Sequence, residues 1–326
     1  MAESPDAVRL PQNAPPPATK EAVMSYGASA GPNLLPISSQ LGRYRILEPL
    51  GQGATAVVYR AQDLTGRQVA LKVLNPAAAS QPHMRSCFQL EYQTLARLRH
   101  PGILRVYESG EANGRLFIAM ELVEGGTLEE FLMRAKSIGE VAAIDIARQV
   151  AEALDYLHES GKIHRDVKIS NILLGPSGRA VLFDFGTVYD LNNPTDNAPG
   201  IYGTPAFLAP EQIRANEKPD KRSDLYSLGI VLYLMVSGRR PFYGSREEVL
   251  EAHLSEIPPP PSAWGWVSPK LEQIILRALA KNPDERFESG DEFALALRGV
   301  EVETEQPKPR LATRLRAWLE DTVRQE

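Results

Sequence analysis

The sequence is poor in cysteine, in long apolar runs and in excess positive charge. Its single cysteine, Cys87, cannot form a disulfide within the chain, which is typical of a reducing, cytoplasmic protein. No stretch of about 18 consecutive apolar residues occurs, and the N-terminus lacks the apolar core of a signal peptide, so we expect no transmembrane segment. The net charge of −5 disfavours bulk binding to nucleic acid, which favours a basic surface.

The sequence does contain enough apolar material for a large core. Hydrophobic residues make up 43% of it and charged residues 24%, as in soluble globular proteins. The exception is segment 1–42, which is rich in Pro, Ala, Ser and Gly. Such a segment buries too little apolar surface to offset its chain entropy, so we predict that it is disordered and that order begins near Tyr44.

The hydrophobic pattern changes from strands to helices near residue 123. Short alternating runs predict strands, and the 3.6-residue periodicity that follows predicts helices. We therefore expect an α+β fold with a small antiparallel β-sheet lobe containing one helix (43–122) and a larger, mainly helical lobe (123–300). The first lobe is predicted to have strands at 44–50, 57–61, 68–73, 104–108 and 116–120, a loop at 76–82 and a helix at 84–98. The second is predicted to have helices at 128–135, 141–158, 223–236, 246–253, 269–280 and 291–297.

The end of the chain, residues 301–326, differs again in composition. A polar linker with prolines leads to residues 310–323, which fit an amphipathic helix with Leu315, Trp318 and other apolar residues on one face. We expect this helix to pack on the body of the protein or on a partner. Its arginines permit a second interpretation, contact with a membrane surface, which the intervening acidic residues weaken.

The stretch from His164 to Asn171 concentrates chemically useful side chains. It lies between an amphipathic helical run and a short apolar run, which predicts a loop held by rigid elements. Asp166 can accept a proton from a hydroxyl, Lys168 can steady a phosphate oxygen, and Asn171 can hold a metal ion. Together they suggest phosphate transfer to a hydroxyl.

A glycine turn, Gly51-Gln52-Gly53, joins two predicted strands. Alone it is consistent with an ordinary hairpin, but its place between strands favours a lid whose backbone N–H groups cover phosphates. In the next strand, Lys72 is either a solvated lysine or a group that holds nucleotide phosphates, and Ala70 on the same face leaves room for adenine. Glu91, in the predicted helix, is the natural carboxylate to hold Lys72 or else an ordinary surface acid.

The tripeptide Asp184-Phe185-Gly186 follows a short apolar strand. Asp and Gly favour turns, so a polar turn explains the tripeptide when it is taken alone. An Asp at the end of a strand is also well placed to bind Mg²⁺ together with phosphate oxygens. For this motif in isolation both interpretations stay open.

Taken together and in order, these motifs resemble those of the eukaryotic-like Ser/Thr protein kinase family, in its bacterial branch. The resemblance covers about residues 44–298 and includes Ala209-Pro210-Glu211. Its specificity comes from the set, because each member alone is a weak signal. It implies the two-lobed protein-kinase fold and transfer of the γ-phosphate of ATP, with Mg²⁺, to serine and threonine hydroxyls of protein substrates. Ile169 departs from the Pro often found there, at a position that braces the loop.

The resemblance also implies roles for individual residues. Asp166 is the catalytic base, Lys168 balances charge on the transferred group, and Lys72, held by Glu91, positions the α- and β-phosphates. The implied Mg²⁺ ligands are Asn171 and Asp184. The implied nucleotide-binding residues are Leu50, Gly51, Gly53, Val58, Ala70, Lys72, Met120, Glu121, Val123 and Leu173, with Met120 as gatekeeper. The implied supporting residues are Glu211 with Arg286, Asp224 beneath the catalytic loop, and the apolar column of His164, Phe185, Leu95 and Val106.

Regulation and alternative functions complete the expectations. Arg165 beside Asp166 suggests control by phosphorylation of the activation loop; Thr195 is the predicted site, and Thr204 is expected to contact Asp166. Two alternatives are a nucleotide-binding pseudokinase that serves as a scaffold and a kinase-fold enzyme that acts on a small molecule. The complete catalytic set argues against the first, and the segment 203–211 against the second.

Overall fold

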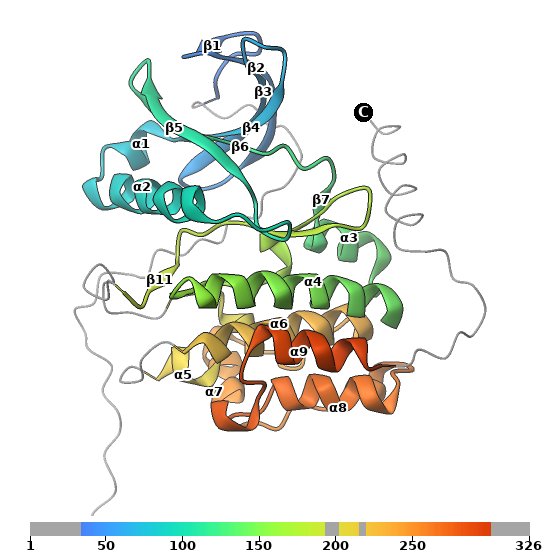
Figure 1. Cartoon of the computed structure of the whole chain (residues 1–326). Helices are drawn as coiled ribbons and strands as arrows, with labels where there is room; N and C mark the ends of the chain where they lie inside the picture. The colour runs from blue at the N-terminus through green and yellow to red at the C-terminus, as the bar shows by residue number, and fades with distance from the viewer. Residues whose placement is uncertain (1–33, 193–201, 215–219, 301–326) are drawn as a thin grey trace, which may run out of the picture.

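The structure, a computed structural model, describes residues 34–192, 202–214 and 220–300. These residues form two lobes, one built around a β-sheet and a larger one built of helices (Figure 1). The chain passes from the small lobe to the large one after Met120, where the last strand of the sheet ends. This arrangement confirms the predicted α+β fold with a small sheet lobe and a larger helical lobe.

A six-stranded antiparallel sheet, in the order β1-β2-β3-β4-β6-β5, forms the body of the small lobe. Because successive side chains point to opposite faces, one face buries a cluster around Tyr44, Tyr59 and Phe117, and the other adds Val58 and Ile118 to the main core. The elements are β1 (Gln40–Leu41), β2 (Tyr44–Gln52), β3 (Ala56–Gln62), β4 (Gln68–Leu74), α1 (Pro76–Ala79), α2 (Pro82–Arg97), β5 (Val106–Ala112) and β6 (Arg115–Met120).

The small lobe differs from the prediction in three places. Residues 34–42, assigned to the disordered segment, belong to the lobe: the backbone N–H of Leu35 donates to Tyr59 Oη at 2.9 Å, and β1 pairs with β2. The loop predicted at 76–82 includes the single helical turn α1, so the lobe has a second, short helix. The strand predicted at 104–108 begins and ends later, as β5. The disorder predicted for 1–33 lies outside the described residues.

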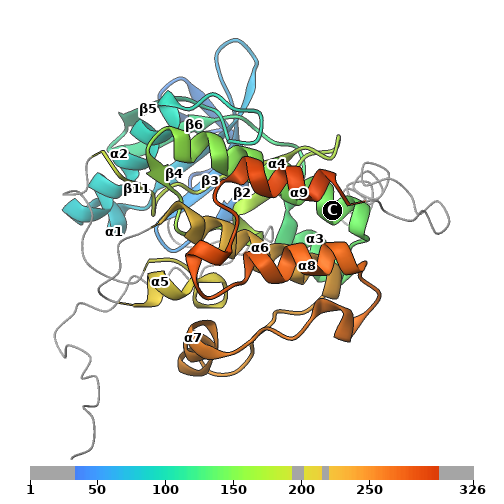
Figure 2. The ribbon, with the colours of Figure 1, turned by 60° about the horizontal axis from the view of Figure 1, so that its bottom comes forward.

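Two long helices, α4 (Glu140–Glu159) and α6 (Lys221–Ser237), pack together at the centre of the large lobe. Nearly every side of α6 is buried. Helix α9 lies against α4, and α8 lies against α6 (Figure 2). The other helices are α3 (Leu128–Ala135), α5 (Pro210–Ile213), α7 (Arg246–Ser255), α8 (Pro269–Ala278) and α9 (Gly290–Arg298). The short strands are β7 (Gly126–Thr127), β8 (Lys162–Ile163), β9 (Ile172–Leu174), β10 (Ala180–Leu182) and β11 (Tyr189–Asp190), in the orders β10-β9-β7 and β11-β8.

The loop that follows α2 joins the small lobe to the large one. The N–H of Leu104 donates to Leu182 O at 3.0 Å, and the N–H of Leu182 donates to Gly102 O at 2.8 Å, so the loop pairs with β10. The N–H of Arg99 donates to Tyr156 Oη on α4 at 3.1 Å. Backbone hydrogen bonds therefore connect the lobes at a second place besides the covalent crossing.

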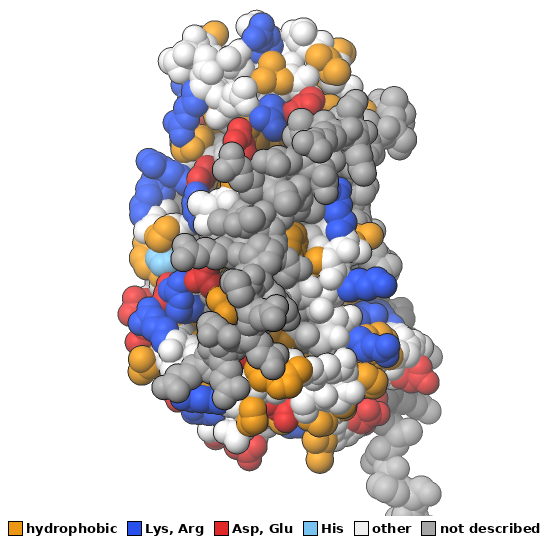
Figure 3. All heavy atoms as spheres, turned by 90° about the vertical axis from the view of Figure 1, so that its right-hand side faces the viewer, with side chains coloured by type: hydrophobic (Ala, Val, Ile, Leu, Met, Phe, Trp, Pro, Cys, Tyr) orange, Lys and Arg blue, Asp and Glu red, His pale blue; other side chains and the backbone are white. Residues whose placement is uncertain are grey.

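The surface carries charge of both signs. On the face that Figure 3 shows, basic and acidic side chains of the described residues are interspersed. Cys87 is exposed and unpaired. Within the described ranges, no helix is both long enough and apolar enough to cross a membrane. The predicted helix at 310–323 lies outside them.

Candidate active site

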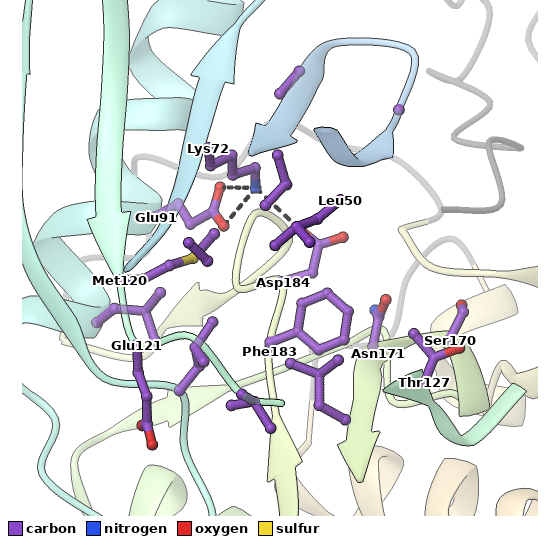
Figure 4. Close-up of a pocket in the computed structure, with 18 of the residues that line it drawn as sticks. Leu50, Lys72, Glu91, Met120, Glu121, Thr127, Ser170, Asn171, Phe183 and Asp184 are labelled. Atoms are coloured by element: carbon purple, nitrogen blue, oxygen red, sulfur yellow. Dashed lines mark hydrogen bonds and ion pairs between the residues drawn. The ribbon is translucent and has the colours of Figure 1, made fainter. Parts of the chain in front are cut away.

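A pocket opens between the lobes and is lined by residues of both (Figure 4). Strands β2, β3 and β4 line it from the small lobe, and β9 and the 3₁₀ turn η1 (Ile169–Asn171) line it from the large lobe. Of the predicted nucleotide-binding residues, nine line this pocket: Leu50, Gly53, Val58, Ala70, Lys72, Met120, Glu121, Val123 and Leu173. The tenth, Gly51, pairs with Val58 in the sheet and does not line the pocket.

Several pocket residues were not singled out by the sequence for nucleotide binding. They include Leu95 of α2, Leu104 of the loop after it, Thr127 of β7, Ser170 of η1 and Phe183. The leucines follow the apolar pattern of ordinary core residues, so periodicity alone does not separate the two roles. The signal for Ser170 and Phe183 is proximity in sequence, since each is next to a predicted metal ligand.

Lys72 and Glu91 meet at the back of the pocket. Lys72 Nζ donates to Glu91 Oε1 at 2.6 Å and to Oε2 at 2.7 Å, and it lies 3.8 Å from Asp184 Oδ1 (Figure 4). The alternation of β4 turns Ala70 and Lys72 to the same side, and α2 presents the buried Glu91 opposite them. The predicted contact is confirmed, and the lysine is held with its ammonium group pointing into the pocket.

The glycine turn is held down at its tip. The N–H of Gly53 donates to Ala56 O at 2.8 Å, which closes the hairpin between β2 and β3. Asn75, buried just after β4, donates its backbone N–H to Thr55 O at 2.8 Å and its side-chain Nδ2 to Ala54 O at 3.3 Å. The turn is therefore a hairpin between two strands, as predicted, while its role as a lid over phosphates stays a prediction. Asn75 is a contact that the sequence did not suggest.

Lys168 and Asn171 line the pocket, and both contact Asp166. Lys168 Nζ lies 2.8 Å from Asp166 Oδ2 and donates to Thr204 Oγ1 at 2.7 Å, while Thr204 Oγ1 donates to Asp166 Oδ1 at 2.9 Å. Asn171 Nδ2 donates to the backbone O of Asp166 at 2.9 Å and to its Oδ2 at 3.2 Å. The Asp166 carboxylate is thus fixed from several sides, and the predicted contact with Thr204 is confirmed.

A buried carboxylate on α6 holds the loop in place. Asp224 accepts the backbone N–H groups of His164 and Arg165, each at 2.8 Å, and lies 2.8 Å from His158 Nε2 on α4. Arg165 has a φ of 67°, a conformation that side-chain-bearing residues rarely adopt. Two charge-assisted hydrogen bonds oppose that strain, so Asp224 sets the direction in which the next residue, Asp166, points.

The motif at 184–186 packs on the loop at 164–171. The rings of His164 and Phe185 lie edge to face with centroids 4.8 Å apart, and Phe185 belongs to the core that also contains Leu95 and Val106. Burial lowers the pKa of the His164 imidazole, so the column stays uncharged at neutral pH. Asp184 has a φ of 60° and lines the pocket together with Asn171.

Arg165 is enclosed by aromatic rings. Its guanidinium lies 4.3 Å from the ring centroid of Tyr202 and 5.3 Å from that of Tyr189, and its Nε donates to Thr187 O at 2.6 Å. Cation–π contacts of this kind stabilise a buried guanidinium. Thr195, the predicted phosphorylation site, lies outside the described residues.

Glu211 and Arg286 form the predicted supporting pair. Arg286 Nη1 donates to Glu211 Oε1 at 2.7 Å and Nη2 donates to Oε2 at 2.8 Å, with the arginine and glutamate side chains 0% and 3% exposed. Ser223 Oγ also donates to Glu211, at 2.7 Å. The pair ties α5, which follows the segment 203–209, to the end of the large lobe.

Comparison with known sequences decides the family. The family described as "Protein kinase domain" matches residues 44–293. The chain belongs to the protein kinase family. The kinase resemblance drawn from the motifs is thereby confirmed.

Bacterial proteins are among the relatives of this kinase chain. It is 39% identical over 281 residues to the serine/threonine-protein kinase PknB of Mycolicibacterium smegmatis, covering 83% of this chain and 45% of that one. It is 37% identical over 278 residues to the serine/threonine-protein kinase PknD of Mycobacterium tuberculosis, covering 83% and 41%. The chain thus spans less than half the length of these curated relatives.

A solved structure shares the fold of this kinase chain. It is the crystal structure of the kinase domain of Mycobacterium tuberculosis PknI, determined on a point mutant, with a TM-score of 0.63 and 33% identity. The match covers 81% of this chain and 98% of that chain. The two-lobed protein-kinase fold is therefore confirmed.

Proposed function

We propose that this chain is a Ser/Thr protein kinase that transfers the γ-phosphate of ATP to serine and threonine hydroxyls of protein substrates. The observation that carries the proposal is that one pocket is lined by Lys168 and Asn171 from the large lobe, both in contact with Asp166, and by the Lys72–Glu91 pair from the small lobe. Phosphoryl transfer asks a protein mainly to position groups and to stabilise charge, and this set supplies both.

Each residue of the set has a specific task in this proposal. Asp166 orients the attacking hydroxyl and accepts its proton, and the hydrogen bond from Thr204 fixes one of its oxygens. Lys168 Nζ, 2.8 Å from Asp166 Oδ2, offsets the negative charge of the phosphoryl group as it is transferred. Lys72 binds the α- and β-phosphates, and Glu91 holds the Lys72 ammonium group in position for that contact.

The donors at the pocket mouth fit Mg²⁺. Asp184 and Asn171 offer hard oxygen ligands, and Asn171 uses its amide nitrogen for Asp166, which leaves its oxygen for a metal. Among the described residues no group of three His, Cys, Asp or Glu could hold a metal ion. Two protein ligands plus phosphate oxygens are a usual shell for Mg²⁺ in kinases. When bound, the ion neutralises charge on the phosphates.

Two single residues support proposals about cellular location and regulation. The exposed, unpaired Cys87 supports a reducing, cytoplasmic location. We retain Thr195 as the proposed site of autophosphorylation. Phosphosite mapping after incubation with Mg-ATP is expected to find Thr195 modified, and an active sample with Thr195 unmodified would reject the assignment.

One assay tests the function against its alternatives. The wild-type chain and Asp166→Ala are incubated with γ-labelled ATP, Mg²⁺ and a generic basic protein, with nucleotide binding measured in parallel. We expect labelling of the protein by the wild-type chain and its loss in Asp166→Ala, with nucleotide binding retained in both. Binding without labelling in either would favour a pseudokinase scaffold, and equal labelling by both would end the kinase proposal.

A further inference from the structure

The segment that links the lobes, residues 121–123, lines two pockets. Glu121, Leu122 and Val123 line the nucleotide pocket on one side. The same three residues line a second hollow on the other side, together with Glu124 and the turn between β9 and β10. Leu122 and Val123 pack against the main core, whereas the charged side chain of Glu121 requires a polar partner.

A side chain that lines the second hollow, that of Arg179, binds Glu121. Arg179, at the end of the turn before β10, donates from Nη1 to Glu121 Oε1 at 2.5 Å and from Nη2 to Oε2 at 3.1 Å. Its Nε donates to Pro101 O at 2.7 Å, in the loop that follows α2. A bidentate arginine–carboxylate pair fixes direction as well as distance, so the guanidinium holds Glu121 in one orientation.

The turn that carries Arg179 is itself anchored. Gln149, in the middle of α4, donates from Nε2 to Gly178 O at 3.0 Å and accepts the N–H of Ala180 at 2.9 Å. Gly175 N–H donates to Arg179 O at 2.9 Å, which closes the turn. The turn that carries Arg179 is therefore fixed to α4, a long central helix of the large lobe. Through the guanidinium of Arg179, the same anchor fixes the side chain of Glu121.

Glu121 is held on its backbone as well. Its N–H donates to Arg105 O at 2.8 Å, which leaves its side chain and its carbonyl to be set by other contacts. We propose that Arg179 is a positioning residue for nucleotide binding: by gripping the Glu121 side chain from behind, it orients the backbone of residues 121–123 toward the adenine. The inference rests on the proposed function, in that the pocket must bind ATP.

The test measures nucleotide affinity directly in the whole chain, by titration of MgADP with calorimetry. In Arg179→Ala we expect the Kd for MgADP to rise about fivefold, the scale of a partly exposed charge-assisted pair, and the KM for ATP to rise in parallel. The kcat should change less than about twofold, because Asp166 and Lys168 are untouched. Glu121→Gln, which keeps the side-chain shape, serves if Arg179→Ala folds poorly, and should show the same direction.

Two further variants separate positioning from general stability. Arg148→Ala removes an arginine of similar exposure, 28% against 33%, that pairs with Asp145 and Glu152 on α4, and it should leave the Kd for MgADP unchanged. The exchange of charges in Arg179→Glu with Glu121→Arg should restore most of the affinity.

The outcomes divide cleanly between the inference and the function on which it rests. A Kd for Arg179→Ala and Glu121→Gln equal to that of Arg148→Ala would overturn the positioning role. So would single and double variants whose effects simply add. Absence of nucleotide binding in the wild-type chain would overturn the proposed function and this role together.

Discussion

Removal of the carboxylate from the buried Glu211–Arg286 pair should destabilise the large lobe strongly. In Glu211→Leu the guanidinium of Arg286 keeps its bonds to Ala280 O at 2.8 Å and to Arg222 O at 3.1 Å, but it loses both bonds to the carboxylate. Because Arg286 is fully buried, its charge is then left without compensation. Breaking such a pair costs about 3–5 kcal/mol, which for a lobe of this size lowers the Tm by about 6–20 °C.

The measurement is urea and thermal unfolding followed by circular dichroism. The control is Glu288→Ala, which removes a 68% exposed acid that pairs with Lys221 and Arg222 and should cost less than about 1 kcal/mol. Replacing both partners, in Glu211→Leu with Arg286→Met, removes the stranded charge and should recover most of the loss. If the double variant is no more stable than Glu211→Leu, uncompensated charge is not the cause and the reasoning fails.

Three further predictions follow from single contacts. Glu91→Gln should lower kcat/KM about 10²-fold, because Lys72 loses its charged anchor. A loss smaller than about tenfold would contradict the role of Glu91 in holding Lys72. Burial lowers the pKa of His253 to about 4, below its usual 6.5, so its contribution to stability is intact above pH 6.5 and is lost as the pH falls to 4. Unfolding at stepped pH should show a loss of about 3 kcal/mol over that window in the wild type but not in His253→Gln. Asn75→Asp removes the side-chain donor to the glycine turn and should raise the KM for ATP about threefold with kcat unchanged. The control is Asn113→Asp, which removes a side-chain donor to Gln40 O at 3.2 Å and should change neither.

Much of the site was predictable because its signals are local. The alternation through Ala70 and Lys72 correctly gave their common face, and the order of the motifs gave the family. The long amphipathic helix α4 was predicted within about a residue at each end, since its apolar stripe is continuous. These features depend on neighbours in the sequence, and a single chain contains that information.

The remainder depends on contacts between distant segments. Leu35 looked like part of a disordered segment, because nothing near it in sequence reveals that Tyr59 accepts its N–H. Strands of two or three residues, such as β7, are too short to show a period. In the sequence Arg179 is an ordinary turn arginine, and only the fold brings it to Glu121. The role of Asn75 likewise depends on its contacts with the glycine turn at Ala54 and Thr55.

The pairing of residues 102–104 with β10 shifts the thermodynamic border between the lobes. Backbone hydrogen bonds join Leu182 to Gly102 and Leu104 in an isolated bridge, and Tyr156 of α4 binds the same loop. When the sheet of the small lobe unfolds locally, the contacts of this loop with the large lobe stay intact. Its amide hydrogens should therefore exchange as slowly as those of α4. The cooperative unit of the large lobe thus includes a piece of chain that precedes the crossing at Met120. If the chain were cut after Met120, the small-lobe fragment would keep residues 102–104, which bind β10 of the large-lobe fragment. This contact favours reassembly of the two fragments.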